Sequence, residues 1–185
     1  MGYALAEQLA NSGARVILVS GPVSLKPVHE NISLHRVNTA QEMLSVCLAL
    51  FSQTNGAILA AAVADYRPKS PVGHKIKSKA MNLVLELEPN PDIAAELGKL
   101  KKKEQFLAGF ALETDNEMAN AREKLKKKNF DFIVLNSLND KGSGFNSDTN
   151  KITIIGKNNK TTHFELKSKY DVAHDIVDYL TKIIS

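Results

Sequence analysis

The stretch FLAGFALETDNEMANAREKLKKKNFDFIVLNS, residues 106–137, decides the fold class of this chain. Its two ends, FLAGFALE and FDFIVLNS, are short apolar runs of the kind that form strands. Between them, Met118, Ala121 and Leu125 recur at the spacing of one helix face. The stretch therefore predicts a strand, a helix and a second strand, which is the repeating unit of a parallel sheet.

The segments before this unit continue the alternation of helices and strands. Thr39 and Glu42 have the spacing of a capping box, which marks the start of a helix. GAILAAAVAD, residues 56–65, is apolar almost throughout and predicts a central parallel strand. The expected series is a helix at 2–12, strands at 15–22 and 32–37, a helix at 40–53 and the strand at 56–65.

The remaining segments supply a loop, a further strand and a hairpin. YRPKSPVGHKIKS, residues 66–78, contains two prolines and a glycine, and it predicts a long loop. NLVLELEP, residues 82–89, alternates as a strand, and the next helix is expected to have Asn90 as its cap and Pro91 in its first turn. The last expected elements are a hairpin with strands at 151–156 and 162–168 and a helix that opens at Ser168 and Asp171.

Together these elements predict one domain, residues 1–185, of α/β class. We expect a three-layer, Rossmann-like and mostly parallel sheet, with helices on both faces and an appended antiparallel hairpin. In such sheets ligands bind beyond the carboxyl ends of the strands.

Composition excludes several classes of protein. A hydrophobic fraction of 43% with 24% charged residues is typical of a globular domain, and no apolar run approaches the roughly 18 residues of a membrane span. The single cysteine, Cys47, cannot form an internal disulfide and lies on an apolar helix face, so we expect a buried thiol and a cytoplasmic setting. A formal charge of +4 is too small to indicate nucleic-acid binding without a concentrated basic face.

Three groups of residues are candidates for a ligand site. The alanines at 60–62 let a ligand approach the backbone, and Asp65 follows them, although tight packing and a turn cap explain the same residues equally well. Lys124 and Lys128 lie four apart on a helix, where their repulsion would be relieved by an anion such as a triphosphate. Complementing the helix dipole is the commoner reason for such lysines. Lys75 lies in the loop, where it either closes over a phosphate or serves solubility.

The chain resembles phosphopantothenoylcysteine synthetase along nearly its whole length. The resemblance rests on seven segments in the order of that family: MGYALAEQLANSGARVILVSGP, AAAVADYRP, HKIKS, LEPNPDIAAEL, AGFALET, NAREKLKKKNFDFIVLN and GFNSDTNKITII. It implies a ligase that activates the carboxylate of 4'-phosphopantothenate with CTP, or ATP, and Mg²⁺. Cysteine then attacks the acyl-nucleotidylate to form the amide.

The resemblance also implies roles for individual residues. Lys75 corresponds to a catalytic lysine on a mobile flap, and Ala62 lies next to the acyl group. The residues assigned to the nucleotide are Ala60, Ala61, Asp65, Lys75, Pro91, Asp92, Ile93, Ala94, Phe110, Lys124 and Lys128.

Members of that family begin with a strand and a glycine-containing turn, and the resemblance implies that both lie upstream of Met1. It also implies a homodimer, for which the hairpin at 151–167 is a candidate contact, and no bound flavin. Two other functions stay open on the residues alone. An NAD(P)-dependent oxidoreductase would need a glycine fingerprint that the sequence lacks, and a nucleic-acid binder would use the basic character given by a pI of about 9.1.

Overall fold

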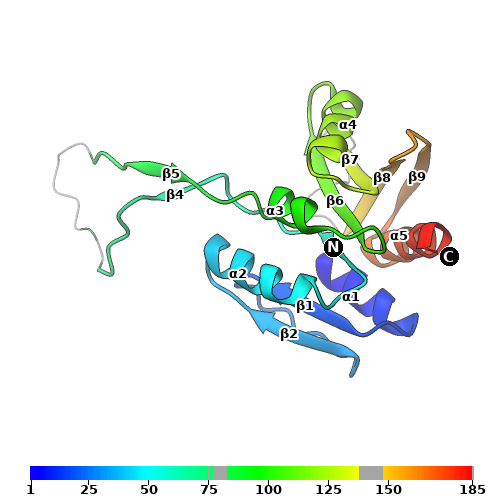
Figure 1. Cartoon of the computed structure of the whole chain (residues 1–185), viewed down its shortest axis with the longest axis horizontal. Helices are drawn as coiled ribbons and strands as arrows, with labels where there is room; N and C mark the ends of the chain where they lie inside the picture. The colour runs from blue at the N-terminus through cyan, green and yellow to red at the C-terminus, as the bar shows by residue number, and fades with distance from the viewer. Residues whose placement is uncertain (75, 77–82, 138–147, 185) are drawn as a thin grey trace.

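We describe the protein from a computed structural model, in which residues 1–74, 76, 83–137 and 148–184 are placed well enough to be described. These residues form five helices and nine strands (Figure 1). The helices are α1 (Gly2–Asn11), α2 (Ala40–Phe51), α3 (Ile93–Leu100), α4 (Glu117–Lys127) and α5 (Lys169–Ile184). The strands are β1 (Val16–Ser20), β2 (Ile32–Arg36), β3 (Gly56–Leu59), β4 (Tyr66–Pro68), β5 (Leu87–Pro89), β6 (Phe106–Glu113), β7 (Phe132–Ser137), β8 (Thr149–Gly156) and β9 (Thr161–Ser168).

The main sheet has the order β3-β6-β7-β8-β9. β3, β6 and β7 are parallel, whereas β8 and β9 form an antiparallel hairpin that pairs with β7. The predicted α/β class and the appended hairpin are therefore confirmed.

Among the residues that the structure describes, β1 and β2 form a separate parallel pair that shares no ladder with the main sheet. The prediction of a central strand at 56–65 was wrong: β3 has four residues and is the edge strand of the main sheet as described. Its apolar character has another origin, because Ala57 and Leu59 face one apolar cluster and Ile58 and Ala60 the other. An edge strand that is covered on both faces has the same continuous apolar sequence as a central strand, so the two cannot be distinguished by sequence pattern.

Helices cover both faces of the main sheet, as predicted. α1 and α5 pack on one face, where Phe132, Val134 and Ile176 are fully buried. α2, α3 and α4 pack on the other face around Leu97 and Ile133. We refer to these as the α1/α5 face and the α3/α4 face.

β4 and β5 pair antiparallel partway along an arm that projects from the body (Figure 1). The prediction of a long irregular loop at 66–78 was wrong at its start, because Tyr66–Pro68 is a strand. The strand predicted at 82–89 is confined to Leu87–Pro89, and Val84 is 85% exposed. The alternation in this segment therefore does not reflect a buried face within this chain.

Two predicted helix caps had different outcomes. Thr39 accepts a hydrogen bond from the amide of Glu42, and the Glu42 carboxylate accepts one from the amide of Asn38, which confirms a cap at this position. Asn90 was expected to cap the following helix, and this was wrong. Asp92 caps α3 instead, through a bond of 3.1 Å from the amide of Ala95.

Gly98 provides a test of the packing between α3 and α4. A Cβ at this position would lie 2.3 Å from the carbonyl oxygen of Lys128. We expect Gly98→Ala to lower the free energy of unfolding by about 1–3 kcal/mol, because the contact with rigid backbone outweighs the gain of about 1 kcal/mol in helix propensity. Urea unfolding measures this change.

Gly21→Ala is the matched control, since a Cβ there meets nothing within 4 Å. Its unfolding free energy should stay within about 0.5 kcal/mol of the wild type. Equal unfolding free energies for the two variants would show that α3 does not pack closely against the carbonyl oxygen of Lys128.

Candidate functional site

The carboxyl ends of β3, β6 and β7 lie along one edge of the main sheet, which we call the ligand edge. Parallel pairing brings Ala60, Glu113 and Asn136 to this edge, at or just beyond the strand ends. α4 follows β6 and begins on the same side. Ligands of parallel α/β sheets bind at such an edge.

Asn90 joins two segments of the predicted site. Its amide donates to the carbonyl oxygen of Asp65 at 2.8 Å, and its Nδ2 donates to that of Ala64 at 2.9 Å. Arg67 in turn donates to Asn90 Oδ1 at 3.2 Å. The segment after β3 and the start of α3 are thereby held against each other, although they are far apart in sequence.

Lys128 lies beside Asp92, the residue that caps α3. The ammonium group is 3.2 Å from Asp92 Oδ1, and the two side chains are 24% and 46% exposed. Long helix side chains lean toward the helix N-terminus, which lets this lysine at the C-terminus of α4 reach back to the cap of α3. Two residues assigned to the nucleotide are thus in direct contact.

Lys124 contacts a different carboxylate at the same edge. Its ammonium group lies 2.5 Å from Glu113 Oε1, at the end of β6, and Asn120 Nδ2 donates to the other oxygen of Glu113. The repulsion predicted between Lys124 and Lys128 is therefore offset by carboxylates of the chain itself, without a bound ligand. Each lysine has a carboxylate partner, and spacing along α4 could not reveal either one.

The other predicted residues lie at the ligand edge with different exposures. Ala60 and Phe110 are half-buried against the cluster of the α1/α5 face. Ala61, Ala62 and Asp65 are exposed, and Pro91 and Ala94 are half-buried. Ile93 is buried in the other cluster, so its side chain serves packing and only its backbone can reach a ligand. Lys75 lies outside the described residues.

Arg67 is a cation of this region that sequence reasoning did not single out. It donates to the carbonyl oxygen of Pro89 and forms an ion pair with Glu88 at 2.8 Å. With its amide in the orientation that satisfies both groups, Gln41 accepts two further bonds from Arg67. The only sign of Arg67 in the sequence was that it is the one arginine among the lysines of the segment 66–78.

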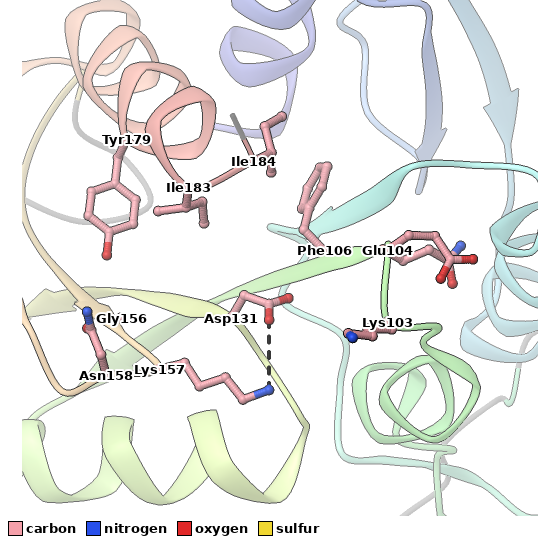
Figure 2. Close-up of a pocket in the computed structure, with 11 residues that line it drawn as sticks. Lys103, Glu104, Phe106, Asp131, Gly156, Lys157, Asn158, Tyr179, Ile183 and Ile184 are labelled. Atoms are coloured by element: carbon pink, nitrogen blue, oxygen red, sulfur yellow. Dashed lines mark ion pairs between the residues drawn. The ribbon is translucent and has the colours of Figure 1, made fainter.

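A pocket of about 450 Å³ lies at the opposite edge of the sheet, between the start of β6, the β8–β9 turn and the end of α5 (Figure 2). Two of its polar side chains, Asp131 and Gln105, are engaged within the chain. Asp131 accepts from Lys101 and from the amide of Leu107, each at 2.8 Å, and Lys157 lies 4.0 Å from its second oxygen. Gln105 donates to two carbonyl oxygens of the chain. The pocket does not include any of the predicted site residues.

Cys47 is half-buried and packs against the cluster of the α3/α4 face. Burial raises the pKa of its thiol, which disfavours the nucleophilic thiolate. The prediction that Cys47 acts as a small hydrophobic residue is consistent with both observations.

Within the described ranges, no three His, Cys, Asp or Glu side chains gather closely enough to hold a metal ion. None of the helices described is both long and apolar enough to span a bilayer.

Comparison with known proteins identifies the family. Residues 1–184 match the family described as DNA/pantothenate metabolism flavoprotein C-terminal domain. A relative named cysteine/cysteine sulfinic acid decarboxylase, from an unknown prokaryotic organism, is 51% identical over all of this chain and 51% of its own length. The coenzyme A biosynthesis bifunctional protein CoaBC of Bacillus subtilis is 42% identical over 99% of this chain and 45% of its own length. The chain thus spans about half the length of these relatives.

A solved structure agrees with the sequence matches. The crystal structure of the C-terminal domain of coenzyme A biosynthesis bifunctional protein CoaBC is 37% identical, with a TM-score of 0.81, over 99% of this chain and 83% of that one. The chain belongs to the family of DNA/pantothenate metabolism flavoprotein C-terminal domains.

Proposed function

We propose that this domain is a phosphopantothenate–cysteine ligase of coenzyme A biosynthesis, acting in the cytoplasm. The carboxylate of 4'-phosphopantothenate attacks the α-phosphorus of CTP, and pyrophosphate leaves. The cysteine amine then attacks the acyl carbon, and CMP leaves with formation of the amide. The observation that carries the proposal is the placement of Lys124 and Lys128 at the ligand edge of a chain that is 42% identical to a coenzyme A biosynthesis protein.

Lys128 is suited to a triphosphate because its present partner, Asp92, is exposed and is a weak competitor. Ion pairs exposed to solvent contribute about 0–1 kcal/mol, so Lys128 can exchange Asp92 for a phosphate at low cost. Charge-assisted bonds to phosphate in a site that excludes water are stronger. Lys75, which lies between β4 and β5 in the sequence, would then meet the charge that develops at the α-phosphorus.

Asp92 and Glu113 are the carboxylates that contact the two lysines proposed to bind the phosphates. Mg²⁺ is commonly held by one or two carboxylates together with substrate phosphates, and it neutralises charge on those phosphates. Asp92 and Glu113 would supply these carboxylates, because each lies beside a lysine proposed to bind the phosphates.

The name of the relative at 51% identity raises decarboxylation as a second activity. That relative has about as many residues outside the match as within it, so its name can refer to the other half. We therefore assign the ligase reaction to this domain, and we expect it to bind neither flavin nor NAD(P).

We propose that one more parallel strand lies between β1 and β3. Within the described residues, β1 pairs only with β2, and β3 only with β6. The helices of the two sheets already form common layers, because α1 packs on α5 and α2 on α3. A strand between them, with its glycine-containing turn near the start of α1, would join the sheets and bring further backbone amides to the ligand edge.

We place the contact of a homodimer on the arm rather than on the β8–β9 hairpin. The hairpin buries Ile152, Ile154 and Ile155 within the chain. The arm instead exposes apolar side chains that nothing in the described chain covers, and such patches favour association. They are Tyr66, Val72, Ile76, Leu83, Val84, Leu85 and Leu87.

The ligase proposal predicts pyrophosphate release that depends on both 4'-phosphopantothenate and CTP. The assay is best run with Mg²⁺ on the natural full-length protein and on this chain. Without cysteine, each site should release one pyrophosphate and then hold the acyl-nucleotidylate. With cysteine, release should continue over many turnovers, because the amine takes the acyl group from that intermediate and frees the site. Absence of release with CTP and with ATP, for the full-length protein, would refute the ligase.

Lys128→Gln should raise the KM for CTP about tenfold and change kcat less than threefold. The variant lacks the charge-assisted contact between the Lys128 ammonium group and the phosphates, which contributes about 1.5 kcal/mol or more. Steady-state kinetics with CTP varied measures the effect. Lys157→Gln is the matched control, because Lys157 lies at the opposite edge and its carboxylate partner is 4.0 Å away. Equal KM values for the two variants would contradict the assignment of Lys128.

Val84→Glu should convert the dimer to a monomer of 20.3 kDa in light scattering after size exclusion, since a charge cannot be buried against an apolar partner. Leu166→Glu, on β9, tests the hairpin and should leave a dimer. The opposite pattern would move the contact to the hairpin.

A further inference from the structure

Every N–H group of the Arg67 side chain is used within the chain. Nη1 donates to the carbonyl oxygen of Pro89 at 2.9 Å and to Asn90 Oδ1 at 3.2 Å. Nη2 lies 2.8 Å from Glu88 Oε1. With the Gln41 amide in the orientation that satisfies both groups, its oxygen accepts from Nη2 at 2.8 Å and from Nε at 2.9 Å. A guanidinium has five N–H donors, so none is left for a phosphate while these bonds persist.

The partners of Arg67 belong to separate parts of the chain. Arg67 lies in β4, where it is paired with Glu88 of β5. Pro89 ends β5, and Asn90 follows it on the way to α3. Gln41 lies in the first turn of α2, and α2 packs against α3. Arg67 therefore joins both strands of the arm to α2 at the point where the chain approaches α3.

The contact with Arg67 fixes the orientation of the Asn90 side-chain amide. A guanidinium only donates, so Asn90 must direct its Oδ1 at Arg67 and its Nδ2 elsewhere. Nδ2 then donates to the carbonyl oxygen of Ala64 at 2.9 Å, next to the bond of 2.8 Å from the Asn90 backbone amide to the carbonyl oxygen of Asp65. If the amide turned over, its oxygen would face the carbonyl oxygen of Ala64 and this bond would be lost.

We propose that Arg67 is a positioning residue of the ligase, which acts through Asn90 on the segment that follows β3. The family resemblance assigns Ala60, Ala61 and Asp65 of this segment to the nucleotide. Without the guanidinium, the Asn90 amide is free to turn over, and the segment loses one of its two bonds to Asn90. The loss falls on the binding of CTP, because the residues that move are those assigned to the nucleotide. This inference rests on the proposed ligase function.

Arg67→Met tests the proposal, because methionine keeps an unbranched side chain and removes every donor. The KM for CTP should rise about tenfold, while kcat and the KM for cysteine change by less than about threefold. Arg67→Lys should recover part of the loss, since an ammonium group can donate to Asn90 but cannot reproduce the planar fork. Glu88→Gln is the matched control. It removes an ion pair from the same guanidinium and keeps the bonds to Pro89 and Asn90, so all constants should stay within about twofold.

A double-mutant cycle tests whether Arg67 acts through Asn90. Asn90→Ala removes the side chain that Arg67 orients, so adding Arg67→Met to that variant should change the KM for CTP by less than about twofold. Effects that multiply in the double variant would overturn the inference. So would an Arg67→Met protein with a lower kcat and an unchanged KM for CTP, which is the pattern of a loss of folded protein alone.

Hydrogen exchange at Asn90 Nδ2 gives a readout that does not need activity. The NMR signal of this amide is assigned by its absence in Asn90→Ala. Its exchange should be faster in Arg67→Met than in the wild type and unchanged in Glu88→Gln, because only the first variant frees the amide. Equal exchange in Arg67→Met and the wild type would overturn the inference. Failure of the ligase proposal is distinguishable, because then the wild-type protein releases no pyrophosphate while the difference in exchange remains.

Discussion

Parallel pairing of β3, β6 and β7 is the constraint on which the rest of the site depends. It brings the carboxyl ends of the three strands to one edge of the sheet. Because a short turn cannot join two parallel strands, the chain must cross over a face of the sheet between one strand and the next. Ala60, Glu113 and Asn136 become neighbours of that edge although more than 70 residues separate the first from the last. Asn90 adds the start of α3 to the same edge, through its two bonds to the chain after β3.

The sequence predicted the elements better than their relations in space. Periodicity and turn residues located β6, α4 and β7 to within about two residues, because those signals depend on neighbours in the chain. The position of β3 in the sheet and the partners of Lys124 and Lys128 depend on residues remote in sequence, so spacing alone could not supply them. Asn90 illustrates the limit. It is a residue type that often caps helices, but here Asp92 caps α3, and the Asn90 side chain donates to the carbonyl oxygen of Ala64 after β3 instead. Asn136 was detectable only as a polar interruption of FIVLNS.

Burial distinguishes structural ion pairs from those available to a ligand. Lys101 is 6% exposed and donates to Asp131 and to a backbone carbonyl, so removing it would leave a carboxylate poorly compensated. The pairs of Lys124 and Lys128 are formed by side chains of which one or both remain in solvent. Water screens such pairs, and the same ammonium groups can therefore change partners without loss of the fold. Their carboxylates keep the lysines at the edge until a stronger anion binds.

The two edges of the sheet differ in how completely their polar groups are satisfied. At the edge with the pocket, Gln105 uses both amide hydrogens and its oxygen within the chain, and Asp131 receives two close donors. At the ligand edge, Asn136 Oδ1 has no hydrogen-bond partner among the described residues. A chain selected only for stability would remove that acceptor, because it costs more than an apolar residue of the same size. A water molecule or a ligand that donates a hydrogen bond would complete this acceptor, which gives the carboxyl ends of the strands a polar group that the chain itself does not use.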